Sequence, residues 1–294
     1  MRIDPVWCLM KIILSLIIFM SLITSFQRNK TLIPAEEKYL PAQTLRDVPY
    51  GKDSAQRMDI YLPAGRSIDS TRAIVLIHGG GWNGGNKSDF ASYIDSFRTR
   101  MPDYAIFNLN YRLVHGRNLF PAQEEDIRSA VGFIADQSGA YHVDKNKLIL
   151  LGASAGAHLA LLQAYKYSSP DIIGVIDFFG PTDLTAMYNH PWHPLVPYAL
   201  QMVTGTDPAA NPELYRRSSP INFVTAHSAP TLILHGSNDP VVDVSQSIAL
   251  KGALDKAGVV NELVIYPGQR HGWHGKTLSN SFDRIEEFLK KNNL

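Results

Sequence analysis

Cysteine is almost absent from this chain of 294 residues. Its single cysteine, Cys8, lies in the N-terminal segment, so the rest of the chain can form no disulfide bond and offers no thiolate nucleophile. An excess of charge of one sign is also lacking, because 28 lysines and arginines oppose 27 aspartates and glutamates, which leaves a net charge of +1. Neither nucleic acid nor strong electrostatic binding to a membrane is therefore indicated.

Clusters of histidine, cysteine or carboxylate residues at the spacing of a zinc site are missing as well. The sequence therefore predicts no metal and no organic cofactor. What the chain does have is a composition of 45% hydrophobic and 19% charged residues, which is typical of a globular protein with a large core. Nothing in it indicates an oligomeric state.

The first thirty residues differ from the rest. Positive charge precedes an apolar stretch at residues 12–26, and a polar exit follows at 27–30. This order is typical of a secretory signal, and the stretch is short for a full membrane span of about 20 residues. We expect residues 1–27 to be a signal peptide or a signal anchor and residues 28–44 to be a linker. The protein would then be periplasmic or secreted, or would be held at a membrane by the uncleaved segment.

Beyond this linker, apolar runs alternate with segments of helical periodicity. Runs such as 73–77 and 148–151 are typical of strands buried on both faces, whereas 121–139 carries apolar residues at helical spacing. The predicted strands are 45–50, 56–62, 73–77, 104–109, 148–151, 172–179, 231–234 and 262–266. Residues 45–294 are therefore predicted to form one α/β domain with a mostly parallel eight-stranded sheet and helices on both faces. Ligands bind such sheets at the carboxyl ends of the strands.

One stretch, at about residues 183–223, interrupts the alternation. It contains six prolines, and a segment this long without regular structure inside a compact domain is usually a functional insertion. Three bulky aromatic residues, Tyr188, Trp192 and Tyr198, lie within eleven positions, which indicates that part of the stretch is packed. We expect a small cap over the ends of the strands.

A G-x-S-x-G pattern joins one predicted strand to the next predicted helix. Residues 152–156 read Gly-Ala-Ser-Ala-Gly, and a serine on such a turn has its hydroxyl exposed above the sheet. Small neighbours are needed because a side chain would clash where strand and helix nearly touch. Small residues also begin helices for reasons of packing alone, so the identification of Ser154 as a nucleophile depends on its partners.

A glycine-rich loop directly follows the strand at 73–77. Residues 78–82 read His-Gly-Gly-Gly-Trp, and backbone N–H groups in such a loop can point toward a developing oxyanion. Together with the N–H after the serine, this makes Gly80, Gly81 and Ala155 the candidate oxyanion hole. A phosphate-binding loop is the alternative interpretation, but the chain has no P-loop pattern.

An acid and a base follow later strands. Asp239 lies after the strand at 231–234, whereas its rival Asp243 suits the N-cap of the next helix. His271 and His274 both follow the last strand, and we favour His271 because it lies nearer to that strand. The resulting chain order, serine, acid, histidine, is that of the α/β-hydrolases.

The chain resembles the α/β-hydrolase superfamily, in particular the HGGG-type esterases related to hormone-sensitive lipase and acetyl esterases. Within these it is similar to the secreted branch of feruloyl and acetyl-xylan esterases. The matching segments are 56–63, 78–82, 120–123 with Asp126, 152–156, 179–183, 219–220, 235–240 and 267–273. The resemblance implies that Ser154 is the nucleophile, Asp239 the acid and His271 the base. Many relatives in the lipase branch have an acidic residue and a glycine where Ala153 and Ala157 stand.

These features predict a serine carboxylic ester hydrolase that cleaves short acyl esters through an acyl-enzyme, with acetyl or feruloyl carbohydrate esters as candidate substrates. Trp82, Tyr188 and Trp192 are expected to line the substrate pocket. The segment around Ser154 also resembles kynurenine formamidases, which leaves an arylformamidase or another amidase as an alternative. A non-catalytic binding protein on this fold is a third reading, although such a protein would be expected to have lost a member of the site.

Overall fold

The computed structural model of the protein describes residues 39–116, 118–167 and 172–294. The predicted signal segment and most of the predicted linker lie outside the described residues. Within the described ranges, no helix is long and apolar enough to cross a membrane. Residues 40–294 form one compact unit.

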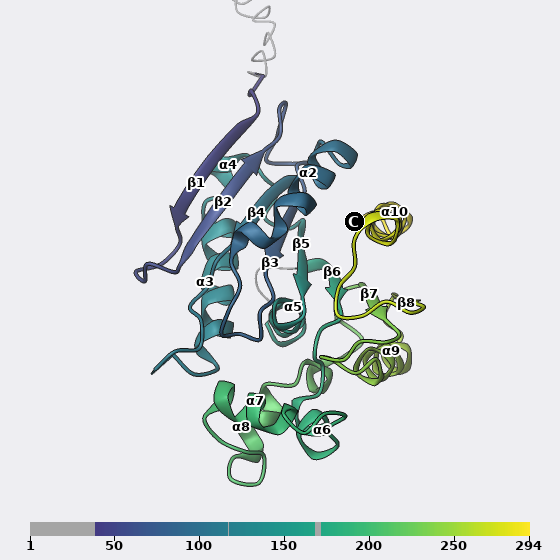
Figure 1. The fold of residues 1–294 in the computed structure, drawn as a ribbon. Coiled ribbons are helices and arrows are strands. Elements are labelled where there is room, and N and C mark those ends of the chain that lie inside the picture. The colour runs from purple at the N-terminus through teal and green to yellow at the C-terminus, as the bar shows by residue number, and fades with distance from the viewer. Residues whose placement is uncertain (1–38, 117, 168–171) are drawn as a thin grey trace, which may run out of the picture. The chain divides into compact units, whose positions relative to one another are not determined.

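An eight-stranded sheet runs through this unit in the order β1-β2-β4-β3-β5-β6-β7-β8 (Figure 1). Its strands are β1 (Gln43–Pro49), β2 (Arg57–Leu62), β3 (Ala73–Ile77), β4 (Ala105–Leu109), β5 (Leu148–Ala153), β6 (Ile172–Phe178), β7 (Thr231–Gly236) and β8 (Asn261–Tyr266). β2 pairs antiparallel with β1 and β4, and all other neighbours pair in parallel. The predicted α/β fold with a mostly parallel sheet is confirmed.

The first strand begins earlier than expected. We placed the end of the linker at residue 44, but β1 starts at Gln43, where the chain pairs with Leu62 of β2. β1 is mostly exposed and has a weak apolar pattern, so its extent depends on pairing with β2 rather than on its own sequence.

Helices on both faces explain the continuous apolar runs. They are η1 (Lys87–Phe90), α2 (Ala91–Arg100), α3 (Ala122–Asp136), α4 (Ser138–Tyr141), α5 (Ala155–Lys166), α9 (Ser245–Ala257) and α10 (Gly275–Lys291). In β3, Val75 and Ile77 join the core under α3, α5 and α9, whereas Ile74 and Leu76 join the core under α2 and α10. Because successive side chains of a strand point to opposite faces, every residue of β3 is buried.

The segment between β6 and β7 is helical. It contains α6 (Leu184–Asn189), α7 (Val196–Thr204), α8 (Pro212–Arg217) and η2 (Pro220–Phe223), and Figure 1 shows α6, α7 and α8 grouped beyond one end of the sheet. Three of the prolines that interrupted the sequence pattern, Pro197, Pro212 and Pro220, occupy first-turn positions, where proline costs no hydrogen bond. These three prolines therefore lie in the first turns of helices in the predicted cap. The sequence pattern did not predict these helices.

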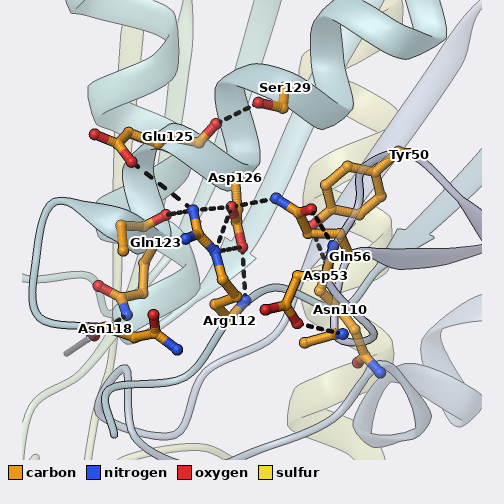
Figure 2. Close-up of polar contacts among 12 residues, drawn as sticks. Tyr50, Asp53, Gln56, Asn110, Arg112, Asn118, Gln123, Glu125, Asp126 and Ser129 are labelled. Carbon is orange, nitrogen blue, oxygen red and sulfur yellow. Dashed lines mark hydrogen bonds and ion pairs between the residues drawn. The ribbon is translucent and has the colours of Figure 1, made fainter. Parts of the chain in front are cut away.

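A buried ion pair fastens α3 to the rest of the domain. The fully buried carboxylate of Asp126 accepts hydrogen bonds from Gln56 Nε2 at 2.7 Å, from Arg112 Nη2 at 2.6 Å and from the Arg112 backbone N–H at 2.8 Å. Figure 2 shows the Asp126 carboxylate between these two side chains. The contacts join α3 to the residue before β2 and to the loop after β4.

Candidate active site

Ser154 lies on a strained turn between β5 and α5. Its backbone has φ 53° and ψ −121°, a conformation that is costly for a residue with a side chain. Added Cβ atoms would lie 2.3 Å from the Gly156 backbone at Gly152, and 1.9 Å from the Ile77 carbonyl oxygen at Gly156. The two glycines thus allow strand and helix to approach closely enough to form this turn.

The glycine-rich loop lies against the same serine. An added Cβ at Gly79 would be 2.8 Å from the Ala153 carbonyl oxygen and 3.4 Å from the Ser154 Cβ. Gly80, Gly81 and Trp82 all have positive φ, and Gly80 and Gly81 line one cavity together with Ser154. Among the described residues, the N–H groups of Gly80, Gly81 and Ala155 have no hydrogen-bond acceptor. The three predicted donors are therefore free and lie next to the serine.

The side chains of His78 and Tyr111 form hydrogen bonds to the backbone of the donor loop. The Tyr111 hydroxyl donates a hydrogen bond to the His78 carbonyl oxygen at 2.9 Å, and the two rings stack at 4.3 Å. His78 Nδ1 lies 2.8 Å from the Gly79 carbonyl oxygen, and burial lowers the pKa of His78. A neutral imidazole that donates to this carbonyl stiffens the loop, so His78 acts as a brace.

His271 connects Ser154 to Asp239. Its Nε2 lies 2.9 Å from the Ser154 Oγ, and its Nδ1 lies 2.7 Å from Asp239 Oδ2. With Nδ1 protonated and donating to the carboxylate, Nε2 is free to accept the serine proton, which is the arrangement that a general base requires. Along the chain His271 follows Asp239 by 32 positions and Ser154 by 117 positions. The structure brings these three residues together.

The two rival residues lie elsewhere. Asp243 accepts a hydrogen bond from the Ser245 N–H at 2.9 Å, but the N-cap of α9 is Val244, so Asp243 lies one residue ahead of the N-cap position that we predicted for it. His274 is exposed and precedes α10. Neither side chain makes a hydrogen bond to a member of the serine, histidine and aspartate group in the described structure.

Asp239 is held as a carboxylate by its neighbours. Burial alone would raise the pKa of Asp239, but hydrogen bonds from His235 and His271 outweigh burial and hold the pKa well below its usual range. Backbone N–H groups of Val241 and Val242 donate to Asp239 Oδ1 at 2.7 and 3.0 Å. The carboxylate therefore stays charged at neutral pH and can stabilise a protonated His271.

Sequence reasoning missed the contribution of His235. This fully buried side chain places Nε2 3.3 Å from Asp239 Oδ2 and 2.9 Å from the Val242 carbonyl oxygen, while Nδ1 lies 2.7 Å from Ser247 Oγ. These contacts assign the proton of His235 to Nε2, and the Ser247 hydroxyl donates a hydrogen bond to Nδ1. The available signal was the spacing of four residues between His235, near the end of β7, and Asp239 in the loop that follows.

A cavity of about 600 Å³ opens at Ser154, and its lining residues differ from those that we predicted. Trp82 lines it, as predicted, but Tyr188 and Trp192 do not. The Tyr188 ring packs edge-to-face on Tyr215 at 5.7 Å, and Trp192 Nε1 donates to the Pro240 carbonyl oxygen at 3.1 Å. Tyr188 thus packs within the cap, and Trp192 joins the cap to the loop after β7, because their polar atoms find partners outside the cavity.

Trp82 is anchored to α5 and to the cap by one histidine. Trp82 Nε1 donates to His158 Nδ1 at 3.2 Å, and the opposite ring nitrogen of His158 donates to the Ser218 carbonyl oxygen at 2.7 Å. Only a neutral His158 can make both hydrogen bonds, since Nδ1 must accept. Burial lowers the pKa of His158 to about 4, which keeps this imidazole neutral at physiological pH.

Stability is expected to fall in acid because of His158. An ordinary histidine has a pKa of 6.5 and the folded protein holds His158 at about 4, so between these values the unfolded chain binds the extra proton. This stabilisation is complete above pH 6.5, is lost as pH falls toward 4, and amounts to about 3 kcal/mol. His158→Gln, which cannot titrate, is expected to show a correspondingly flatter decline of the free energy of unfolding. The exposed His227→Gln is the control, and an equally steep decline in His158→Gln would contradict the assignment.

The described part of the chain contains no group of three or more histidine, cysteine or carboxylate residues that could hold a metal ion.

The sheet order, the serine turn at the carboxyl end of β5, and the acid and histidine after β7 and β8 define an α/β-hydrolase fold. Residues 58–254 match the BD-FAE family. The chain belongs to this family.

Relatives and solved structures agree with this assignment. The chain is 30% identical over 245 residues to the esterase LipQ of Mycobacterium tuberculosis, covering 77% of this chain and 56% of that protein. It is 25% identical to an acetylxylan esterase of Xylanibacter ruminicola, covering 81% of this chain and 48% of that protein. The structure of a truncated carbohydrate esterase from gut microbiota superposes with a TM-score of 0.74 at 25% identity, over 89% of this chain and 99% of that one. The chain spans about half the length of the curated relatives it matches.

Proposed function

We propose that the protein is a serine carboxylic ester hydrolase that acts on small-molecule esters. The observation that carries the proposal is the continuous hydrogen-bonded sequence from Ser154 through His271 to Asp239, next to free backbone donors at the wall of one cavity. Nucleophile, base, orienting acid and oxyanion donors are the components that acyl transfer requires.

The first half of the proposed reaction forms an acyl-enzyme. As the Ser154 Oγ attacks the ester carbonyl, His271 Nε2 takes its proton, and Asp239 stabilises the resulting imidazolium. The negative oxygen of the tetrahedral intermediate is held by the N–H groups of Gly80, Gly81 and Ala155. Loss of one such donor typically costs about 2.7–4 kcal/mol of transition-state stabilisation. His271 then returns the proton to the leaving alcohol as the bond between carbonyl carbon and alcohol oxygen breaks.

The second half of the reaction releases the carboxylic acid product. A water molecule gives its proton to His271 as its oxygen attacks the acyl-enzyme, and the proton then returns to the Ser154 Oγ when the carbon–serine bond breaks. The same oxyanion donors serve both halves. Each step uses residues that the structure places within hydrogen-bond distance, and no cofactor is required for proton balance.

The names of relatives support ester cleavage and leave the substrate open. Those reported above are named as an esterase, an acetylxylan esterase and a carbohydrate esterase, and another relative, from Arabidopsis thaliana, is an isoprenylcysteine methylesterase. Acetyl or feruloyl carbohydrate esters are therefore candidates, and so are esters of apolar groups.

The test combines covalent labelling with turnover. A fluorophosphonate probe is expected to label the protein once, at Ser154, and to abolish hydrolysis of p-nitrophenyl acetate in proportion to labelling. Methyl ferulate, acetylated xylan and N-formylkynurenine complete the panel. Absence of labelling would favour a non-catalytic binding protein, and hydrolysis of N-formylkynurenine faster than of any ester would favour the amidase alternative.

A further inference from the structure

One helix of the cap, α7, supplies a large part of the wall of the cavity beside Ser154. Residues 195–203, at the start of α7 and along it, supply much of the lining, and Met187 and Val242 face the same space. Leu200 and Val203 are buried beneath the helix, so α7 is packed on the domain and presents a fixed apolar wall.

The mouth of the cavity carries an unusual concentration of exposed apolar side chains. Leu195, Tyr198, Met202 and Val241 are 64%, 62%, 50% and 50% exposed, and all four line the cavity. In the described part of the chain only seven large hydrophobic residues are at least 50% exposed, so four of the seven gather at this one opening. Exposed apolar side chains that cluster in this way mark a binding surface.

The cavity offers few partners for a polar group. Apart from Ser154 and His271, the polar side-chain atoms of its lining belong to Asn83, to the hydroxyl of Tyr198, and to the indole N–H of Trp82, which is already bonded to His158. A sugar ring buried here would leave most of its hydroxyl groups without hydrogen bonds, which is unfavourable for each of them. An aliphatic chain carries no such groups.

We propose that the preferred substrates are esters with a medium-length aliphatic chain, which lies along α7 and leaves through the apolar mouth. This inference rests on the proposed ester hydrolysis. A cavity of about 600 Å³ is within the usual range for a drug-sized ligand, so an acetyl group alone would leave most of its apolar wall uncovered, whereas a chain of roughly six to ten carbons would cover much more of that wall. Short esters remain substrates because the reacting groups are the same.

The first experiment measures kcat/KM against chain length. One series varies the acyl group, from p-nitrophenyl acetate to the butyrate, hexanoate and octanoate. The other keeps acetate and lengthens the alcohol from ethanol to octanol, which shows on which side of the ester the chain binds. Each buried methylene is expected to raise kcat/KM by up to about fourfold, and octanoate or octyl acetate should exceed its shortest homologue at least tenfold.

The results distinguish failure of this inference from failure of the proposed function. Flat or falling profiles in both series, with acetate still hydrolysed, would overturn the chain preference alone, as would hydrolysis of acetylated xylan with a higher kcat/KM than octyl acetate. No turnover of any ester would overturn the proposed function as well.

The second experiment changes the wall. The double substitution Tyr198→Ser and Met202→Ser is expected to lower the ratio of kcat/KM for the longest to the shortest ester at least fivefold, because two apolar surfaces at the mouth are lost. Ile248→Ser is the matched control, since Ile248 is 52% exposed on α9 and does not line the cavity. Thermal unfolding of each variant shows that the fold is intact, and an unchanged ratio in the double variant would overturn the role of α7.

Discussion

Replacing Ser154 by alanine is expected to lower kcat for p-nitrophenyl acetate by about 10⁶-fold. Without the Oγ no acyl-enzyme can form, and His271 has no hydroxyl to deprotonate, so only the oxyanion donors and substrate binding continue to act. Steady-state turnover, together with labelling by a fluorophosphonate, measures the effect. Labelling should vanish completely, because the bond to phosphorus is made by the missing oxygen.

The control for this substitution is Ser129→Ala. Ser129 lies exposed on α3, where its hydroxyl donates a hydrogen bond to the Glu125 carbonyl oxygen one turn earlier (Figure 2). This variant should keep full activity, and both variants should unfold at nearly the same temperature as the parent protein. Turnover by Ser154→Ala that matches the parent would remove Ser154 as the nucleophile.

Replacing Asp239 by asparagine is expected to lower kcat by about 10⁴-fold. The amide can donate to Nδ1 of His271 where the carboxylate accepted, which favours the tautomer with the proton on Nε2. That tautomer cannot take the proton of Ser154, and the negative charge that stabilises the imidazolium is lost. Measurement of kcat for p-nitrophenyl acetate at neutral pH, where the low pKa of Asp239 keeps the parent carboxylate charged, shows the full effect.

Asp243→Asn provides the comparison four residues away. Its side chain accepts a hydrogen bond from the Ser245 N–H at the start of α9, a role that asparagine can also fill. Activity within about twofold of the parent is expected, as for surface changes remote from the site. A greater loss in Asp243→Asn than in Asp239→Asn would reverse the assignment of the acid.

Local sequence patterns were sufficient for the sheet and for the turn that carries Ser154. Runs such as 148–151 are apolar at every position because both faces of β5 are buried, and that pattern does not depend on the neighbouring strands. Gly152 and Gly156 are required by contacts of 2.3 and 1.9 Å that an added Cβ would make. Such steric requirements leave a signature within a few residues of Ser154.

The cap was predicted as a segment but not as helices. Proline-rich sequence suggested a loop, yet Pro197 and Pro212 begin α7 and α8, and the side chains of Asp183 and Asn211 cap α6 and α8. Helices of six to nine residues are too short to be stable alone. They form because they pack on the domain, and this packing is not visible in the local sequence.

The sequence by itself determined the local parts of the proposed reaction: the strained serine, the donor loop, and the order of acid and histidine after successive strands. Each depends on short-range sterics or on the rule that parallel strands end at one edge of a sheet. Only the tertiary structure decided which side chains surround the substrate. Tyr188 packs within the cap and Trp192 bonds to the loop after β7, whereas Leu195, Tyr198 and Met202 line the cavity. The position of α7 results from contacts between segments distant along the chain.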